Sequence, residues 1–359
     1  MSNATLRDRG AAEGSRYVTL DAMRGAAALA VATYHLETKL LPGGYLAVDF
    51  FFLLSGFVLT QTYAGRMTAG LGFTRFGAMR AIRLLPVHVI GVMIGAGLAL
   101  VAALRHWDGA TPVPKIAVSF AFNVFMVPDP FEEMLFPVNG PAWTLLAEML
   151  ASFAFAGILV QMSSRGLMLV CVASLGALAA FGWSSETLTG TEHPFLAGGF
   201  SWATADIGLL RTIFSFPLGV LIARLLGDRQ RRPSAWAVVL VGTLLVPLAL
   251  PMSGPARFWF DLSCIALVFP ALLMFGSSIE LPRLFVPLAT VAGEVSYPLY
   301  AVHIGFEAVV WYALGRRLEL PFIAILLAYL SIVLTLAFVI ARYIDPPIRR
   351  ALTRRFLLG

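Results

Sequence analysis

The stretch LDAMRGAAALAVATYHL, which runs from Leu20 to Leu36, decides the fold class. It is an alanine-rich apolar run of about the length at which a helix crosses the hydrocarbon core of a bilayer, and Asp21, Arg24 and His35 interrupt it. An ionisable side chain inside such a helix is costly unless it is paired or faces water, so each of the three is a functional candidate. The sequence therefore predicts a membrane helix that carries chemistry.

The composition of the whole chain places this helix in a polytopic membrane protein. Of 359 residues, 59% are hydrophobic and 13% are charged, and the mean hydropathy is +0.83. Ordinary soluble domains carry roughly 25% charged residues, which excludes a soluble globular protein. We expect an all-α membrane domain over residues 17–345, with a cytoplasmic N-terminal tail before it (1–16) and a basic cytoplasmic C-terminal tail after it (346–359).

Long apolar runs separated by glycine and proline predict about ten transmembrane helices. The predicted spans lie near residues 20–36, 45–63, 84–104, 142–161, 166–183, 205–226, 236–250, 258–275, 287–314 and 321–344. One further apolar run, at 116–127, has only 12 residues. That length favours a short re-entrant or interfacial segment over a span.

The distribution of charge predicts the orientation. The net charge is +6, and all basic residues except Lys39 and Lys115 are arginines. With ten spans, 18 arginines fall on one side and six basic residues on the other, so the positive-inside rule places the arginine-rich side and both termini in the cytoplasm. The expected location is the inner (plasma) membrane, and the scattered arginines argue against a nucleic-acid site. Because residues 1–16 are polar, no cleavable signal peptide is expected.

Two features of the first helix suggest a site along one face. Arg24 and His35 are eleven residues apart, which on a helix returns to within roughly 20° of the same face, about 16 Å further along the axis. The small residues between them (Ala28, Val31, Ala32) would let another chain or a thin ligand approach closely. In the alternative interpretation, Arg24 forms a purely structural ion pair with Asp21, three residues before it.

Polar residues in the next two helices extend this site. Asp49 lies near the outer end of its helix, at a depth like that of His35, where a carboxylate would orient the imidazole. Arg80 and Arg83 share one helix face at the cytoplasmic boundary. Paired guanidinium groups suit phosphate or pyrophosphate, although ordinary positive-inside arginines would look the same. Arg211 falls within a span and is interpreted as a counter-ion inside the bundle.

Two later motifs add candidates. NGPAWTLLAEML places Trp143 at the outer interface and Glu148 about two turns deeper, where a carboxylate needs a partner or a proton. SYPLYAVHIG places Tyr297 and His303 on one side of a helix that Pro298 loosens. We interpret Trp143, Tyr297 and His303 as substrate-contact residues, with simple packing as the alternative for the last two.

These motifs, in this order, resemble the membrane acyltransferase family 3, whose members O-acylate sugars and other hydroxyl compounds. The matching pieces are LDAMRG to YHL (20–36), GGYLAVDFFFLLSGF (43–57), the arginine pair before LLP (80–86), WTLLAE (143–148) and SYPLYAVH (296–303). Each is weak alone, but five in order, each at the start or end of a predicted span, are specific. Ala22 and Thr144 stand where the family commonly has Gly and Ser, and both changes are conservative in size.

The resemblance implies an acyltransferase that uses an acyl-CoA donor, most simply acetyl-CoA, from the cytoplasmic side. It gives functional weight to Arg24, His35, Arg80 and Arg83, of which the arginines would hold the CoA phosphates. The acceptor would be a sugar or polysaccharide of the cell envelope, with polysaccharide-assembly proteins as further partners. No metal is expected, since Cys171 lies in an apolar run with no His or Cys beside it, as does the other cysteine, Cys264.

The predicted mechanism places the thioester beside His35. Neutral His35, oriented by Asp49 or Glu148, would act as general base on the acceptor hydroxyl, and a covalent acyl-histidine relay is the main alternative. A different class of function, a small-molecule or proton-coupled transporter, would also place polar residues within helices. Matching broken helices in two halves are not found in the sequence, which argues against it. A non-catalytic assembly factor for envelope polysaccharides is the third reading.

Overall fold

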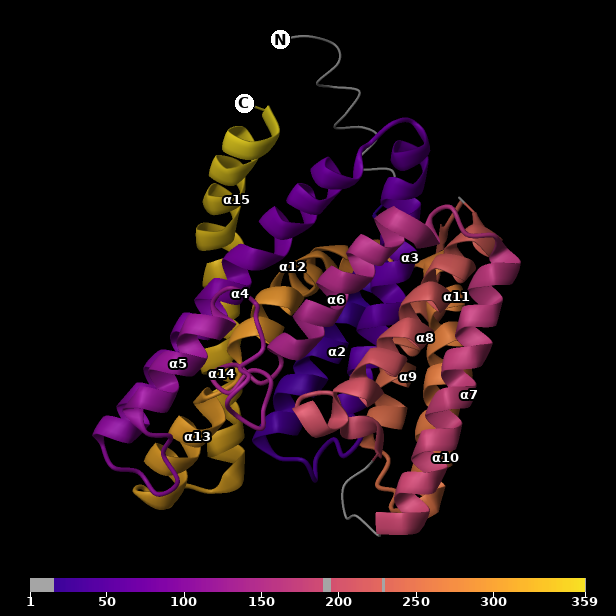
Figure 1. Ribbon diagram of the computed structural model, residues 1–359. Helices are drawn as coiled ribbons and strands as arrows, with labels where there is room; N and C mark the ends of the chain where they lie inside the picture. The colour runs from indigo at the N-terminus through magenta and orange to yellow at the C-terminus, as the bar shows by residue number, and fades with distance from the viewer. Residues whose placement is uncertain (1–15, 190–194, 228–229, 359) are drawn as a thin grey trace.

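The computed structural model describes residues 16–189, 195–227 and 230–358, and most of these are helical (Figure 1). The α-helices are α2 (Val18–Leu36), α3 (Ala47–Thr68), α4 (Phe73–Leu104), α5 (Val113–Asn123), α6 (Ala142–Ala154), α7 (Ser164–Thr189), α8 (Ala205–Leu226), α9 (Trp236–Ala249), α10 (Gly254–Ser263), α11 (Phe269–Ser278), α12 (Val286–Val302), α13 (Phe306–Val310), α14 (Phe322–Val339) and α15 (Asp345–Thr353). Two two-residue strands, β1 (Arg232–Pro233) and β2 (Ile279–Glu280), pair in parallel.

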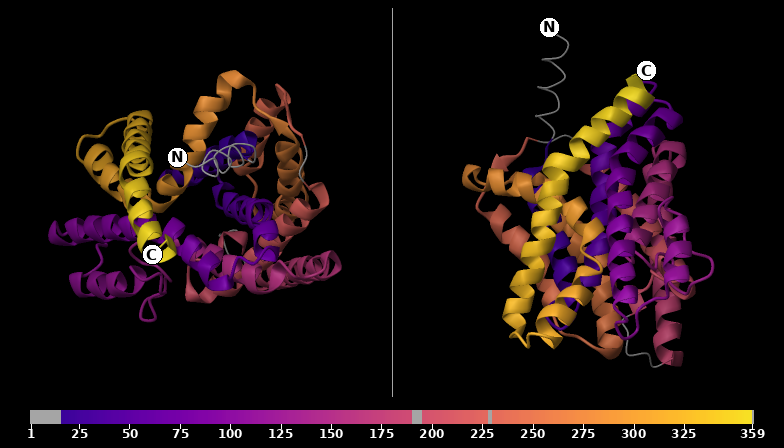
Figure 2. Two further views of the ribbon diagram at one scale, coloured as in Figure 1. Left: turned by 90° about the horizontal axis from the view of Figure 1, so that it is seen from above. Right: turned by 90° about the vertical axis from the view of Figure 1, so that its left-hand side faces the viewer.

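Short 3₁₀ and π-helical turns extend or join these helices. The 3₁₀ turns are Gly44–Leu46, Phe195–Ala197, Trp202–Thr204 and Arg283–Phe285, and the π turns are Phe155–Leu159, Cys264–Val268, Trp311–Arg316, Ile340–Ile344 and Arg354–Leu358. The π turns allow α6, α10 and α14 to continue without a loop, and α14 runs on through α15 as one helical segment, Phe322–Leu358. That segment is longer than a bilayer requires, and its last part lies against α4 (Figure 2).

Seven helices in the described part of the chain are long and apolar enough to cross a membrane, fewer than the ten predicted. They are Gly44–Thr68, Phe73–Leu104, Ala142–Leu159, Ser164–Gly182, Trp202–Leu226, Ala256–Ser278 and Phe322–Leu358. Three predicted spans are not among them. Charged residues make α2 too polar, α9 has only 14 residues, and α12 ends at Val302, before the predicted span does. These three helices still pack together, since α2 contacts both α9 and α12.

The short apolar run forms α5, which begins at Val113 and ends at Asn123. Eleven residues of helix extend about 16 Å, roughly half of the hydrocarbon core. The helix lies against α4 at the end of the bundle opposite α15 (Figure 1). It therefore does not cross the bundle.

The close approach of α3 and α8 forms much of the core. A Cβ atom on Gly56 of α3 would lie 2.1 Å from the carbonyl oxygen of Phe216, and one on Gly219 of α8 would lie 2.0 Å from that of Leu53. Neither contact is possible for a larger residue, so the two glycines permit backbone contact between the helices. Helix α2 lies inside the bundle, between α3, α9, α12 and α14.

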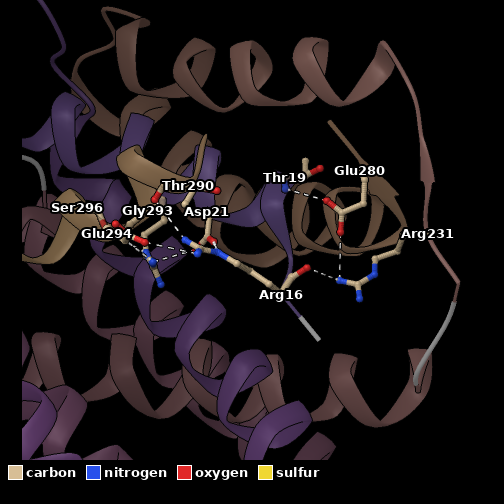
Figure 3. Close-up of polar contacts among 10 residues, drawn as sticks. Arg16, Thr19, Asp21, Arg231, Glu280, Thr290, Gly293, Glu294 and Ser296 are labelled. Carbon is tan, nitrogen blue, oxygen red and sulfur yellow. Dashed lines mark hydrogen bonds and ion pairs between the residues drawn. The ribbon is translucent and has the colours of Figure 1, made fainter. Parts of the chain in front are cut away.

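Polar contacts tie the start of α2 to the strand pair at one end of the bundle (Figure 3). The Arg231 guanidinium lies 3.2 Å from a Glu280 carboxylate oxygen, donates to the carbonyl of Arg16, and lies over the Tyr17 ring at 3.9 Å. Glu280 also accepts from the backbone N–H of Thr19 at 3.3 Å. Burial raises the pKa of the Glu280 carboxyl above its ordinary value, and Arg231 opposes that shift. The strand pair thus holds the entry to α2.

The arginine-rich loops gather at this same end, where the α3–α4 turn and α15 also lie (Figures 1 and 2). Arg224, at the end of α8, donates to the carbonyl groups of Leu159, Val160 and Met162 between α6 and α7. Helix α15, which contains most of the predicted basic C-terminal tail, packs against α4. Residues 1–15 lie outside the described part of the chain.

Candidate active site

The helices that carry the first and last sequence motifs pack closely, because small residues line their contact. A Cβ atom on Gly25 of α2 would lie 2.6 Å from the Cβ of Ala292 of α12, and one on Gly293 would lie 2.7 Å from Asp21. Such backbone proximity is typical of small residues at membrane helix contacts. It brings the motif residues of α2 and α12 to one place.

Arg24 is fixed at this contact. Its guanidinium donates to Ser296 Oγ at 3.0 Å, to the carbonyl of Gly293 at 2.7 Å and to an Asp21 carboxylate oxygen at 2.9 Å. Figure 3 shows the labelled partners side by side. Asp21 also receives Arg16 at 2.6 Å, so one carboxylate serves two arginines. The ion pair that the sequence allowed is present, and Arg24 keeps part of its positive charge unopposed.

The two arginines of α4 are in different environments. Arg80 is 4% exposed, and it donates to Glu148 Oε1 at 2.6 Å and to Ser152 Oγ at 3.2 Å. Arg83 is exposed, and in the part of the chain that the structure describes it makes no hydrogen bond or ion pair. Arg83 therefore has its hydrogen-bond donors free for a ligand.

These arginines line one cavity of about 940 Å³. Residues of α2, α3, α4, α6, α12 and α15 form its walls. Its charged lining has seven arginines and three carboxylates: Arg16, Arg24, Arg80, Arg83, Arg342, Arg349 and Arg350, with Asp21, Glu148 and Glu294. The cavity is therefore strongly positive and suits an anion. Its size lies near the upper end of the range for ligand pockets, roughly 300–1,000 Å³.

Three arginines near the end of the chain had no place in the predicted site: Arg342, in the π turn before α15, and Arg349 and Arg350 of α15. Arg349 is paired with Asp345, one turn before it, while Arg342 and Arg350 are exposed. They reach the cavity because α15 packs against α4, next to Arg83. A run of arginines after the last span carries no sequence signal for that contact.

Aromatic and hydroxyl side chains form another part of the cavity wall, away from the arginines of α15 in the chain. Tyr297 donates its hydroxyl to the carbonyl of Leu84, and Tyr300 is hydrogen-bonded to Thr144 between hydroxyl groups 2.9 Å apart. The Tyr300 ring packs edge-on against Phe51, with ring centroids 5.5 Å apart. All five residues border the cavity, and Tyr297 is thus placed where a substrate could contact it.

Two histidines meet immediately beyond Tyr300. The ring centroid of His303 is 5.8 Å from that of Tyr300 and 4.9 Å from that of His35. His303 Nε2 lies 3.1 Å from His35 Nδ1. His303 is completely buried, whereas His35 is partly exposed. Of the two rings, only His35 has accessible surface in this conformation, and contact of His303 with a substrate stays a prediction.

The two carboxylates expected beside His35 are bound elsewhere. Asp49 forms an ion pair with Arg211 at 2.6 Å, and both side chains are 1% exposed. Glu148 accepts from Arg80 and from Ser55 Oγ. Neither carboxylate contacts His35, and Arg211 is the counter-ion that the sequence suggested. The physical reason is that a buried carboxylate without a counter-ion destabilises the folded protein. Each of the two carboxylates therefore pairs with an arginine.

The small residues of α2 do not form an open track between Arg24 and His35. Ala28 and Ala32 are buried against Val295, Leu299 and Tyr329 of α12 and α14. Of the two possibilities predicted from the sequence, the structure shows close packing of other helices against this face. It leaves no open route for a thin ligand along Ala28 and Ala32. The cavity instead approaches the histidines from the side of Phe51 and Tyr300.

Trp143 faces a different space from the one expected. It packs between Gly199 and Gly208, where a Cβ atom would lie 2.6 to 2.8 Å from its ring, and Arg211 lies over it at 5.9 Å. With other apolar residues it lines a second cavity of about 470 Å³ between α6, α7 and α8. That position separates it from the arginine-lined cavity.

A buried polar cluster near the opposite end of α3 was not predicted from the sequence. Arg257 donates to the Tyr45 hydroxyl at 2.8 Å and lies 2.7 Å from an Asp261 carboxylate oxygen, and Tyr45 donates to the same carboxylate. Arg211 donates to the Tyr45 carbonyl at 3.0 Å and so connects this cluster to Asp49. The Arg257 to Asp261 spacing of four residues was the available signal.

Comparison with known proteins agrees with the resemblance. A family model described as an acyltransferase domain matches residues 17–342. A protein of Rhizobium radiobacter named protein 2 in the picA locus is 31% identical over 158 residues, 39% of this chain and 81% of that protein. No solved structure matches the chain.

Two further relatives carry names that state a reaction. A candidate peptidoglycan O-acetyltransferase of Bacillus subtilis is 42% identical over 74 residues, 20% of this chain and 12% of that protein. A candidate O-acetyltransferase of Staphylococcus aureus is 35% identical over 82 residues, 22% of this chain and 14% of that protein. Both matches cover a small part of a longer relative.

Proposed function

The chain belongs to the acyltransferase family whose family model matches residues 17–342, and on that premise we propose that it transfers an acetyl group from acetyl-CoA to a hydroxyl of a sugar or polysaccharide. Its class is a multi-pass membrane O-acyltransferase. The proposal concerns the donor, the acceptor and the residues that act on them. We take the membrane domain that performs this reaction to cover residues 17–345.

One observation supports acetyl-CoA as the donor: Arg83 lines the arginine-rich cavity, is exposed, and is unpaired among the described residues. The phosphate groups of CoA are the anions that guanidinium groups bind best, since each can accept two parallel hydrogen bonds. Arg24 and Arg83 hold the pyrophosphate, while Arg80, bound to Glu148, stiffens the wall behind them. The arginines of α15, at the mouth of the cavity, take the remaining phosphate.

The pantetheine arm then extends toward Tyr297 and Tyr300, which line the cavity. Tyr300 contacts His303, and His303 contacts His35, so the thioester would arrive within a side chain's length of the histidine pair. A small movement of Phe51 or Tyr300 would join the cavity to His35. Such a movement of a lining side chain is common when a site closes on its substrate.

His35 acts as general base in this proposal. It removes the proton from the acceptor hydroxyl, whose oxygen attacks the thioester carbonyl carbon. The new ester C–O bond forms, the C–S bond breaks, and the departing CoA thiolate takes the proton from the His35 imidazolium. Atoms and charge balance without a metal or a redox partner.

The orientation follows from the arginines. Because the arginine-rich end of the bundle holds the donor cavity, the positive-inside rule places that cavity in the cytoplasm, where acetyl-CoA is made. The acceptor would reach His35 from the opposite side of the inner membrane. A cell-envelope glycan is the acceptor class that fits, and the name of the Bacillus subtilis relative supports it.

The decisive experiment uses membranes that contain the full chain or its His35→Ala variant at matched abundance. Each is given acetyl-CoA labelled in the acetyl group, and label in the envelope glycans is counted. The proposal expects labelling by the parent chain and a loss of about 10²–10⁴-fold in the variant. Labelling of glycans by the variant at the parent rate would refute the role of His35. Mass spectrometry of envelope glycans from a deletion strain would then identify the acceptor by its missing acetyl group.

A further inference from the structure

We propose that His303 fixes His35 in one tautomer, with the proton on Nδ1, so that Nε2 of His35 is the nitrogen that takes the proton of the acceptor hydroxyl. The inference rests on the proposed function for its catalytic meaning, but the tautomer itself does not depend on the donor or the acceptor. It makes His303 a positioning residue. It also replaces the carboxylates that the sequence suggested for that task.

The tautomer of His303 follows from the end of α12. The last carbonyl groups of a helix have no N–H partner within it, and α12 ends at Val302. His303 Nδ1 lies 2.9 Å from the carbonyl oxygen of Tyr300 and 3.2 Å from that of Leu299. Carbonyl oxygens only accept, so Nδ1 must carry the proton. In neutral His303 the other nitrogen, Nε2, is then an acceptor.

The tautomer of His35 follows in turn. Its Nδ1 lies 3.1 Å from His303 Nε2 and 2.9 Å from the carbonyl oxygen of Val31. Both neighbours are acceptors, so His35 Nδ1 donates and carries the proton. Nε2 is left with its lone pair, and no hydrogen bond to it is formed within the described ranges. Histidine in water prefers the opposite tautomer, with the proton on Nε2, so the site reverses the intrinsic preference.

Burial decides which ring reacts. His303 is 0% exposed and cannot meet a substrate in this conformation, whereas His35 has accessible surface. In the Ser-His-Asp arrangement a carboxylate accepts the Nδ1 proton of the reacting histidine and so keeps its Nε2 free. Here the neutral imidazole of His303 accepts the Nδ1 proton of His35 in place of a carboxylate, because Asp49 and Glu148 are paired with arginines. When His35 takes a proton on Nε2, its Nδ1–H bond to His303 becomes charge-assisted and stronger.

The direct test is the ring ¹⁵N spectrum of the full chain, labelled in histidine and held in lipid nanodiscs at pH about 8, where ordinary imidazoles are neutral. Long-range ¹H–¹⁵N correlations separate the two tautomers. The chain has five histidines, and single substitutions assign the signals. His88 is an internal control, because its Nε2 lies 2.8 Å from the carbonyl of Asn123 and must carry the proton. We expect Nδ1–H for His35 and His303, and Nε2–H for His88. A wild-type His35 signal with the proton on Nε2 overturns the inference.

The functional test compares two substitutions of His303. His303→Gln keeps a side-chain acceptor for the His35 proton, and His303→Leu removes it. We expect His303→Leu to lower kcat by about 10²-fold, less than the roughly 10⁴-fold for loss of an orienting carboxylate, because Val31 still accepts. The KM for acetyl-CoA should stay within a factor of two, and His303→Gln should recover most of kcat. A matched buried control, His88→Gln, should leave kcat unchanged.

The outcomes are separable from those of the proposed function. If His303→Leu fails to fold, the wild-type spectrum still decides the tautomer. If kcat falls equally in the Gln and Leu variants, or not at all in Leu, the positioning role is wrong. If His35→Ala transfers acetyl at full rate while the spectrum shows Nδ1–H, the proposed function fails and the tautomer assignment stands.

Discussion

Arg80 of α4 and Glu148 of α6 form an ion pair of 2.6 Å, and this pair gives the two arginines of α4 different roles. Arg80 is neutralised and nearly buried, whereas Arg83, three residues on, is exposed in the cavity with Arg24 and Arg349 near enough to repel it. Arg24 and Arg349 have carboxylate partners, whereas Arg83 forms no ion pair among the described residues, so the repulsion at Arg83 raises the free energy of the empty site. An anionic ligand would relieve that repulsion, so ligand binding should depend on Arg83 more than on any paired arginine.

We therefore expect Arg83→Ala to weaken the binding of acetyl-CoA by about 10- to 100-fold. Hydrogen bonds to charged groups contribute roughly 1.5–3 kcal/mol, and each 1.4 kcal/mol is about tenfold in Kd. The midpoint of thermal unfolding should not fall, because no ion pair is lost. Calorimetric titration of the purified protein with acetyl-CoA measures both Kd and its salt dependence.

Arg66→Ala is the matched control. Arg66 lies at the same end of the bundle, over the Tyr63 ring at 5.1 Å, but does not line the cavity. The substitution removes the same charge, so a loss of affinity equal to that of Arg83→Ala would mean that only the general positive field matters. That result would contradict a specific phosphate contact.

The arginines of α15 predict a second, distinguishable effect. If the thiol end of CoA lies deep, beside Tyr300, the nucleotide and its 3′-phosphate lie at the mouth near Arg350. Arg350→Ala should then weaken CoA about tenfold and leave 3′-dephospho-CoA almost unaffected. Arg355→Ala, one and a half turns further along and away from the cavity, should change neither Kd. Unchanged binding of both ligands by Arg350→Ala would refute the placement of the 3′-phosphate beside Arg350.

Part of this site was predictable because helical periodicity shows which residues share a face. Arg24, Arg80 and Arg83 were expected to hold phosphate, and the three do line one cavity. Arg80 is nevertheless bound to Glu148, a pairing between residues 68 positions apart that no local pattern contains. The periodicity of one helix gives a direction for each side chain but does not give the neighbour it meets.

The same limit explains the errors around His35. Asp49 was expected there because its depth in the membrane is similar, but depth and direction do not identify the side chain that it contacts. The partner of Asp49 is Arg211, 162 positions away, and the partner of His35 is His303, 268 positions away. The seven apolar helices of the described residues do not include α2 for a related reason: α2 packs against α12 inside the bundle and so tolerates a polarity that a lipid-facing helix would not.

The Asp49–Arg211 pair predicts a stability effect in place of a catalytic one. Removing one partner from a buried pair leaves an uncompensated charge and costs about 3–5 kcal/mol. Arg211→Met should therefore lower the midpoint of thermal unfolding strongly, and Asp49→Asn should do so as well, while kcat per folded molecule changes little. Asp206→Asn is the control, since Asp206 is exposed at the start of α8.

The double variant Asp49→Leu with Arg211→Met sharpens this test. Replacing both members of a buried pair by apolar groups is often close to neutral, so the double variant should be more stable than Arg211→Met alone. A loss of kcat in well-folded Asp49→Asn, with unchanged unfolding, would restore the catalytic role that the sequence suggested. Thermal unfolding in detergent and transfer rates on the same preparation provide both measurements.

The last prediction separates a general base from an acyl-histidine relay. In a relay the acyl group would occupy Nε2 of His35, so a second base would have to deprotonate the acceptor hydroxyl in the following step. The two carboxylates that the sequence suggested, Asp49 and Glu148, are both bound by arginines, and His303 Nε2 accepts the His35 proton. Direct transfer needs only one base. We therefore expect that acetyl-CoA mixed with the protein in the absence of acceptor releases no burst of free CoA. Rapid mixing followed by thiol detection measures it, with the His35→Ala variant as baseline. A burst that approaches one CoA per protein molecule, absent from His35→Ala, would establish the relay instead.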